Sequence, residues 1–377
     1  MSDPVLFEVL HTSGGANFGL ATLNAEKTLN SLSLPMVRAL TAQLTEWERD
    51  NSIALVVIQG AGDRAFSAGG DIQELYRSMV EADGGENPYA RAFFEEEYRL
   101  DYLIHQFDKP IIAWANGFVM GGGLGVMAAC SHRIGTETSR IAMPEISIGL
   151  FPDAGATWFL AQMPVHLAHF IAWTGCQLGA TDAQKVGLID RVVRSADKDK
   201  VMKALRTHHW DVRDNNHAKL DQLLPKLTAR AARLPDSEID RVEIDIASVV
   251  GSCVSAPRPA LAFAELLGSL DLDDKWLGRA AETFRAGSTT TAHLIPEQIR
   301  RARGLDLKQT FMLELNIALQ CASRPEFVEG IRARLIDRDN NPKWCYETLD
   351  AVPEDWVMSH FDPPPGGHPL SNLPAPK

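Results

Sequence analysis

Two acidic side chains stand out in this sequence because of the residues around them. Glu145 lies in the apolar run IAMPEISIGL, where a carboxylate is partly desolvated and its pKa is raised. Asp153 follows across a turn indicated by Gly149 and Pro152. Two carboxyl groups brought together by one loop can divide the roles of acid and base. Each also has an ordinary interpretation, Glu145 as the neighbour of a helix N-cap after Pro144 and Asp153 as a turn or cap residue, and both alternatives stay open here.

Two glycine-rich segments could supply backbone donors. They are FSAGGDI at residues 66–72 and NGFVMGGGLG at residues 116–125, and each lies near a strand end or opens a helix. Glycine allows positive φ and close approach of a ligand, so such loops can aim free N–H groups at an anion or a developing oxyanion. The alternative for each segment is a simple turn.

Two other segments resemble known catalytic or cofactor-binding motifs, but each departs from its motif. The segment AFSAG at residues 65–69 resembles a nucleophile elbow around Ser67, but Ala65 stands where that motif needs its first glycine. Gly123, Gly125 and Ala128 have the spacing of a dinucleotide fingerprint, which should begin as its strand ends. Here the residues 117–122 intervene, and no second βαβ unit with a terminal acid follows clearly.

Composition excludes several classes of function. The chain has 377 residues, 45% of them hydrophobic and 23% charged, which is typical of a globular protein with one or two sizeable cores. Its net charge of -12 gives no general attraction to nucleic acid, so any anionic ligand needs a local site. The five cysteines show no CxxC pair and indicate reduced thiols rather than a metal site. No leader pattern and no membrane-spanning apolar stretch is evident, so we expect cytoplasmic residence without a membrane partner.

The first half of the chain has an α/β pattern that can position these loops. Residues 54–59 (ALVVIQ) and 111–115 (IIAWA) predict buried strands, because each is a short apolar run that ends in turn residues. Residues 34–50 predict a helix with Val37, Leu40, Leu44 and Trp47 on one face. A buried helix is expected to begin near Gly123.

Beyond residue 195 the strand signals fade. Residues 236–250 and 296–321 look helical, so we expect a core at 1–195 and a mainly helical region at 196–361. The last segment, 362–377 (DPPPGGHPLSNLPAPK), is rich in Pro and Gly and is expected to be a disordered tail.

The two glycine-rich segments and the acidic loop together resemble the crotonase (enoyl-CoA hydratase/isomerase) superfamily. The resemblance implies a spiral of ββα units with a helical C-terminal region, and an acyl-CoA substrate. It implies that the N–H groups of Gly70 and Gly122 form an oxyanion hole, and that the backbone of Ala68 lies near the CoA adenine. Asp71 belongs to the same expected substrate-binding set. LNAEKTLNSL at residues 23–32 resembles the loop along the CoA, with Lys27 as a candidate for its phosphates.

Three features indicate the branch of the superfamily. The hydratases use two glutamates, and the first position is Gly125 here, so water addition is disfavoured. The isomerases can work with one acid at the position of Glu145 and remain an alternative. MPEISIGLFPDAG at residues 143–155 and FVEGIRARLIDRDNNPKW at residues 327–344 resemble the 3-hydroxyisobutyryl-CoA hydrolases. The resemblance covers residues 5–361. It departs from that branch at AGATW (154–158) and STTT (288–291), two segments that could alter the acyl pocket.

The resemblance therefore implies hydrolysis of a short hydroxyacyl-CoA, with 3-hydroxyisobutyryl-CoA of valine catabolism as the expected substrate. Glu145 would attack the thioester carbonyl or activate water, and Asp153 would position the substrate or protonate the leaving thiolate. Neither a metal nor a cofactor is implied, since CoA is part of the substrate. A binding subunit without activity is the alternative from another class. Trimers and hexamers are common among relatives, so a homo-oligomer stays open.

Overall fold

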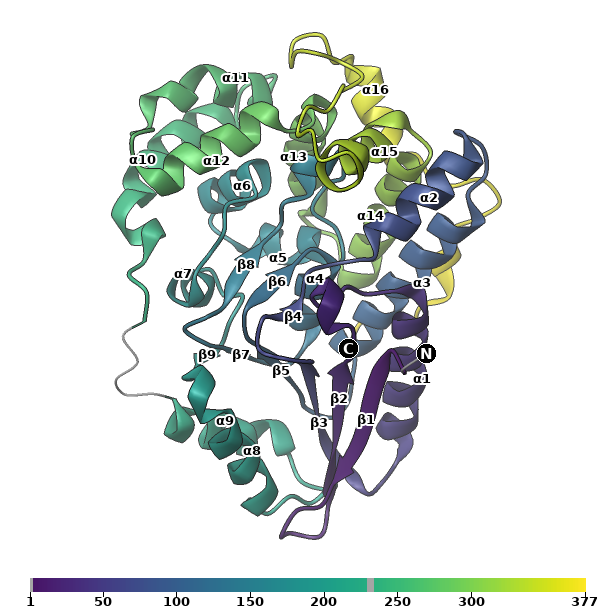
Figure 1. Cartoon of the computed structure of the whole chain (residues 1–377), viewed down its shortest axis with the longest axis vertical. Helices are drawn as coiled ribbons and strands as arrows, with labels where there is room; N and C mark the ends of the chain where they lie inside the picture. The colour runs from purple at the N-terminus through teal and green to yellow at the C-terminus, as the bar shows by residue number, and fades with distance from the viewer. Residues whose placement is uncertain (1–2, 229–233) are drawn as a thin grey trace. The chain divides into compact units, whose positions relative to one another are not determined.

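The computed structural model describes residues 3–228 and 234–377 (Figure 1). Contacts divide the chain into two compact units that interleave along the sequence. Unit 1 holds residues 1–70, 100–141 and 178–237, and unit 2 holds residues 71–99, 142–177 and 238–377. This division follows contacts rather than chain order, so it does not coincide with the boundary expected near residue 195.

The main sheet lies in unit 1 and has six strands in the order β1-β2-β3-β5-β7-β9. They are β1 (Val5–Leu10), β2 (Asn17–Leu23), β3 (Ile53–Gly60), β5 (Ile111–Ala115), β7 (His132–Gly135) and β9 (Arg191–Val192). β1 pairs antiparallel with β2, and all other neighbours are parallel. The expected strands at 54–59 and 111–115 are confirmed as β3 and β5, and both are almost wholly buried, as central parallel strands require.

A smaller sheet explains the repeating plan of the chain. Its strands, in the order β4-β6-β8, are β4 (Ala65–Ser67), β6 (Phe118–Met120) and β8 (Arg140–Ala142). Each strand pair, β3–β4, β5–β6 and β7–β8, gives its first strand to the large sheet and its second to the small one. Helices follow the first two of these pairs, so the expected spiral of ββα units is confirmed.

Helices cover the main sheet within unit 1. α1 (Leu34–Arg49) begins where the Ser33 hydroxyl accepts a hydrogen bond from the N–H of Met36. It buries Val37, Leu40, Leu44 and Trp47, which confirms the expected helix at 34–50 and its apolar face. α8 (Lys198–Thr207) and α9 (Asn216–Leu227) add Val201, Leu205, Leu220 and Leu224 to the core cluster that contains sheet residues such as Leu55 and Ile112. Unit 1 also holds α4 (Gly122–Ala129) and α7 (Ala180–Lys185).

Unit 2 is mainly helical (Figure 1). Its helices are α2 (Ile72–Ala82), most of α3 (Pro88–His105), α5 (Ala156–Gln162), α6 (Val165–Thr174), α10 (Glu238–Cys253), α11 (Pro259–Leu266), α12 (Lys275–Ala286), α13 (Thr289–Ala302), α14 (Leu307–Ala322), α15 (Pro325–Ile331) and α16 (Glu354–Met358). The helix expected at 296–321 is split into α13 and α14. Gly304 has a φ of 89° there, and Asp306 caps α14 by accepting from the N–H of Gln309.

The C-terminal segment 362–377 differs from the expected disordered tail. Leu370, in the 3-10 turn η7 (Pro369–Asn372), is fully buried. Lys308 donates to the carbonyl oxygens of Ser371 (2.8 Å) and Leu373 (2.5 Å), and Arg99 donates to that of Pro369 (2.7 Å). A proline-rich segment forms little regular structure by itself, but cationic side chains on α3 and α14 satisfy its carbonyls while its leucine is buried.

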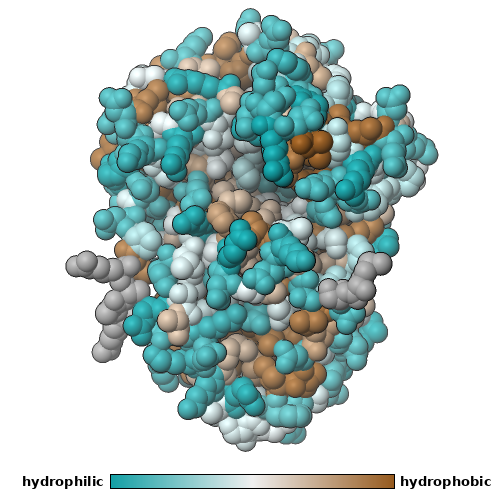
Figure 2. Space-filling model, viewed as in Figure 1, coloured by the Kyte–Doolittle hydropathy of each residue, from teal (hydrophilic) through white to brown (hydrophobic). Residues whose placement is uncertain are grey.

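The surface seen in Figure 2 is mostly hydrophilic, as the share of charged residues leads one to expect. Figure 2 shows one face on which hydrophilic side chains predominate, with a hydrophobic patch over β1, where Leu6 and Val9 are exposed. Among the described residues, no helix is both long enough and apolar enough to span a membrane.

Candidate active site

The two glycine-rich loops meet within unit 1. Gly123 opens the first turn of α4 so close to β4 that a Cβ atom there would lie 2.6 Å from the Cβ of Ser67. A Cβ on Gly69 would lie 3.7 Å from the Cα of Gly121. Gly69 (φ 100°) and Gly121 (φ 49°) both have backbone conformations that L side chains rarely adopt. Glycine is therefore needed here for close approach as well as for turning.

These loops leave backbone donors available. Gly122 is the first residue of α4, and helix-opening N–H groups have no partner inside the helix. Among the described residues, neither Gly122 nor Gly70 uses its N–H in a hydrogen bond. A pair of free N–H groups, one of them at the positive end of a helix dipole, is suited to an oxyanion.

Ser67 has a structural role in this loop. Its side chain is fully buried, and its hydroxyl accepts a hydrogen bond from the N–H of Gly69 at 3.3 Å. It fixes the glycine turn, which agrees with rejecting it as a nucleophile.

The expected CoA loop lies in the same unit. Lys27 is exposed on the 3-10 turn η1 (Glu26–Thr28). The loop is held by Asn30, which is fully buried and donates to the carbonyl oxygens of Ala61 (3.0 Å) and Ala65 (2.9 Å). Ala68 already donates its N–H to the carbonyl of Leu29, so only its carbonyl remains for an adenine amino group.

Asp71 belongs to unit 2, and the structure gives it an ordinary function. It is the N-cap of α2, where its carboxylate accepts from the N–H of Glu74 at 3.3 Å. The expected contact of Asp71 with CoA stays a prediction.

Glu145 and Asp153 lie together in unit 2. Glu145 begins the 3-10 turn η2 (Glu145–Ile148) and is 4% exposed, and its buried Oε2 has no hydrogen-bond partner within residues 3–228 and 234–377. Burial, and then the charge of Asp153, raises the pKa of Glu145 well above its usual value. The sequence-based expectation of a desolvated acid near a second carboxyl thus agrees with the geometry.

Asp153 has one strong hydrogen-bond donor. The Tyr98 hydroxyl, on α3, donates to its Oδ2 at 2.7 Å, and both side chains are buried. Burial raises the pKa of Asp153 to about 7, although the Tyr98 hydrogen bond works in the opposite direction. A carboxyl group with a pKa near neutrality is suited to proton transfer.

The loop that carries Asp153 is fixed from two helices. After Asp153, Ala154 (φ 54°) and Gly155 (φ 85°) form a left-handed turn. Both carboxylate oxygens of Glu314 on α14 accept backbone N–H groups at 2.8 Å, one from Gly155 and one from Thr157. From α13, Gln298 donates to the carbonyl of Pro152 at 2.6 Å and to the Thr157 hydroxyl at 2.6 Å.

A further acid lies in this buried group. Glu97 is 2% exposed, and burial together with the charges of Asp153 and Glu314 raises its pKa well above the usual value. Burial likewise raises the pKa of Glu314 to about 8. Glu97, Glu145, Asp153 and Glu314 thus all have raised pKa values, which favours sharing of protons over full ionisation.

Tyr98, Glu97, Glu314 and Gln298 were missed from the sequence. Glu97 and Tyr98 lie in the charged stretch FFEEEYRLDY, which looks like a solvated helix face. Glu314 was detectable, because it is the only acid in the apolar run FMLELNIAL, the same signal that singled out Glu145.

The C-terminal segment 327–344 supports η2. A Cβ on Gly149 would lie 2.5 Å from the carbonyl oxygen of Glu326, and a Cβ on Gly330 would overlap the backbone of Ile148. α15 therefore lies directly against the turn that presents Glu145. The chain then continues through a π-helical turn, η5 (Arg332–Ile336).

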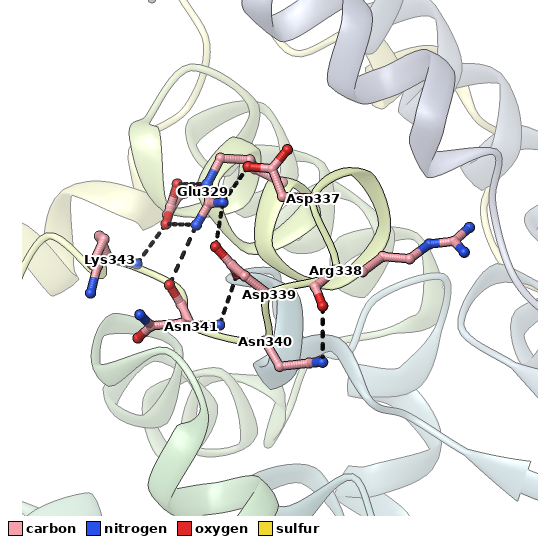
Figure 3. A network of polar contacts seen from close by, with 8 residues as sticks. Glu329, Asp337, Arg338, Asp339, Asn340, Asn341 and Lys343 are labelled. Atoms are coloured by element: carbon pink, nitrogen blue, oxygen red, sulfur yellow. Dashed lines mark hydrogen bonds and ion pairs between the residues drawn. The ribbon is translucent and has the colours of Figure 1, made fainter.

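A network of polar contacts holds the loop after η5 in place (Figure 3). Arg332 donates to Glu329 at 2.8 and 2.9 Å, to Asp337 at 2.5 Å and to Asp339 at 2.8 Å. Glu329 also accepts from the N–H of Lys343 at 2.6 Å. The contacts of Arg332 thus hold the loop after η5 in place, which gives the charged pattern RARLIDRDN a structural role.

The departure STTT at residues 288–291 lies beside the acidic turn. Ser288 donates its N–H to the carbonyl of Ile146 at 2.8 Å and caps α13. The hydroxyls of Ser288 and Thr290 both hydrogen-bond to the buried carboxyl of Glu326. The segment therefore holds η2 through the backbone N–H of Ser288 and holds α15 through its hydroxyl groups, all within unit 2.

The chain is similar in sequence and fold to known proteins. A family model described as enoyl-CoA hydratase/isomerase matches residues 18–361. The mitochondrial 3-hydroxyisobutyryl-CoA hydrolase of Danio rerio is 35% identical over 362 residues, which cover 96% of this chain and 91% of that protein. The crystal structure of a carnitinyl-CoA dehydratase from Mycobacterium thermoresistibile superimposes with a TM-score of 0.83 at 32% identity, covering 97% of this chain and 98% of that one. An enoyl-CoA hydratase from Rhodobacter sphaeroides 2.4.1 gives 0.80 at 30% identity, covering 96% and 98%.

Proposed function

Because this chain belongs to the enoyl-CoA hydratase/isomerase (crotonase) family, we propose that it hydrolyses the thioester of a short hydroxyacyl-CoA, with 3-hydroxyisobutyryl-CoA as the first candidate. The observation that supports it most is the pair Glu145 and Asp153, both buried in one unit and both with raised pKa values. Position 125 is a glycine inside α4, so this helix supplies no second glutamate for hydration. Cytoplasmic residence stays a prediction, because the similar hydrolase of Danio rerio is a mitochondrial protein.

In this proposal the thioester carbonyl oxygen accepts hydrogen bonds from the N–H groups of Gly70 and Gly122. These bonds strengthen as the oxygen gains charge in the tetrahedral intermediate, and removal of one such donor typically costs about 3 to 4 kcal/mol of barrier. Lys27 and the carbonyl of Ala68 would bind the CoA phosphates and adenine.

Glu145 supplies the attack in one of two ways. Either its carboxylate attacks the carbonyl carbon and forms a mixed anhydride that water opens, or it removes a proton from an attacking water. A raised pKa makes this carboxylate a stronger base while lowering its ionised fraction at neutral pH. The unpartnered Oε2 in a water-poor setting favours direct attack.

Asp153 supplies the proton that the leaving thiolate needs. With a pKa of about 7 it holds that proton in a useful fraction of molecules at neutral pH, and the Tyr98 hydroxyl stabilises the carboxylate once the proton has left. The bond from carbonyl carbon to sulfur breaks, CoA leaves as the thiol, and the acid is released after hydrolysis.

The test is a free-thiol assay of the purified protein across a panel of acyl-CoAs. We expect thiol release from 3-hydroxyisobutyryl-CoA, and much less from isobutyryl-CoA, because a site that pairs the hydroxyl leaves polar groups unpaired without it, a penalty of up to about 10⁴-fold. Glu145→Gln should abolish the release. Double-bond migration without thiol release would instead establish an isomerase, and no turnover of any acyl-CoA would favour a binding subunit.

A further inference from the structure

Unit 2 contains a cavity of about 730 Å³ that neither Glu145 nor Asp153 lines. Its walls come from α6, from the connection between α10 and α11 together with the first residue of α11, from α13, and from residues 352–358, which include α16. This volume is in the range of cavities that bind small organic molecules.

Much of the wall is apolar and rigid. Its apolar side chains include Val254, Pro257, Pro296, Ile299, Val352 and Val357. Prolines and β-branched residues have few conformations to lose, so a ligand with an apolar body can bind without ordering the wall.

Positive charge exceeds negative charge around the cavity. Three arginines, Arg258, Arg300 and Arg303, line it against two glutamates, Glu297 and Glu354. Glu297 is also shared between Arg300 and Arg301, both at 2.6 Å. In a chain with a net charge of -12, such an excess has to be local, and it favours an anionic ligand.

Two of these arginines have no carboxylate partner among the described residues. Arg258 is held by backbone carbonyls instead, at 2.9 Å from that of Asp350, 2.7 Å from that of Leu349 and 3.0 Å from that of Val352. Its position is thus fixed while its charge stays uncompensated. Arg303, just after α13, is exposed and forms no ion pair in this part of the chain.

A histidine beside Arg303 adds a hydrogen-bond acceptor. His169 is 4% exposed, and its Nδ1 donates to the carbonyl of Val165 at 2.8 Å. In the neutral ring Nε2 then carries no hydrogen, and it has no partner among the residues that the structure describes. Burial, and the charge of Arg303, lower the pKa of His169, so the ring is neutral at neutral pH. Its free nitrogen is suited to a hydroxyl donor close to the anionic group.

We propose that this cavity is a second ligand site, for an amphipathic hydroxycarboxylate. The carboxylate pairs with Arg303 and Arg258, the adjacent hydroxyl donates to Nε2 of His169, and the apolar body lies against the proline and valine wall. The site is separate from the acidic loop and does not depend on the reaction proposed for it.

Isothermal titration of the full-length protein tests the site with three probes of equal chain length. We expect 2-hydroxyoctanoate to bind more tightly than octanoate, and octan-1-ol to bind at least tenfold more weakly than octanoate, because only the acids pair with the arginines. Equal affinity of octan-1-ol and octanoate, or no heat from either acid at millimolar concentration, overturns the proposal.

Variants locate the binding. Arg303→Gln should weaken both acids about tenfold. Arg285→Gln, at an exposed position near the end of α12 outside the cavity, is the matched control and should change neither. His169→Phe should remove the advantage of 2-hydroxyoctanoate over octanoate. Unchanged affinities in Arg303→Gln would show that the acids bind elsewhere.

Discussion

Replacing Tyr98 with phenylalanine should move the alkaline limb of the pH–rate profile. The Tyr98 hydroxyl donates to Oδ2 of Asp153 at 2.7 Å, and both groups are buried. A hydrogen bond to a charged acceptor contributes about 1.5 to 3 kcal/mol. Its loss destabilises the ionised form of Asp153, and about 1.4 kcal/mol corresponds to one pKa unit, so the pKa of Asp153 should rise by roughly one to two units.

The consequence depends on the role of Asp153. If it donates the proton to the leaving thiolate, activity is lost at high pH when this acid ionises. In Tyr98→Phe the alkaline limb of kcat/KM should therefore move from about 7 to between about 8 and 9. The substitution removes one oxygen and keeps the ring, so the packing of α3 should survive.

The assay is thiol release measured between pH 5 and 10 with 3-hydroxyisobutyryl-CoA. Tyr76→Phe on α2 is the matched control, because its hydroxyl forms no hydrogen bond among the described residues, and its profile should coincide with that of the unmodified protein. An unmoved alkaline limb in Tyr98→Phe would refute the assignment of Asp153 as the proton donor. Movement of the acidic limb instead would show that Asp153 acts as a carboxylate.

Three further outcomes are expected. In a single turnover in ¹⁸O-water, attack by Glu145 and hydrolysis of the anhydride at the glutamyl carbon should put ¹⁸O into the peptide that contains Glu145. If the label is found only in the released acid, and hydroxylamine traps no anhydride, this route is contradicted. Removal of residues 362–377 should lower the melting temperature by several degrees, because burial of Leu370 alone contributes about 2 kcal/mol; an unchanged melting temperature would show that the segment does not pack. The pKa values of Asp153 (about 7) and Glu314 (about 8) in the folded protein lie above their values near 4 in the unfolded chain. Between these values the folded state binds more protons, so the free energy of unfolding should fall as the pH rises from about 4 to about 8. Denaturant titrations should give a smaller fall for Asp153→Asn, and an equal fall would mean that Asp153 is not protonated in the folded protein.

Local sequence determined the elements and the two loops of this protein. The apolar runs at β3 and β5 and the amphipathic pattern of α1 follow from short-range patterning, because strand and helix periods are properties of neighbouring residues. Glu145 and Asp153 could be paired in advance because one short loop holds both. The glycine-rich segments could be identified because glycine is needed where the backbone approaches closely, as between Gly123 and Ser67.

Only the tertiary structure decided which polar groups support the loop that carries Glu145 and Asp153. Tyr98 and Glu314 lie far from Asp153 in sequence, and an acid or tyrosine on a helix looks the same whether its face is solvated or buried. Tertiary structure also shows that the side chain of Asp71 caps α2. The tail at 362–377 shows the same limit, since its order comes from Lys308 and Arg99 rather than from its own composition. Burial and hydrogen-bond partners are long-range properties, and they set the pKa values on which the proposed chemistry depends.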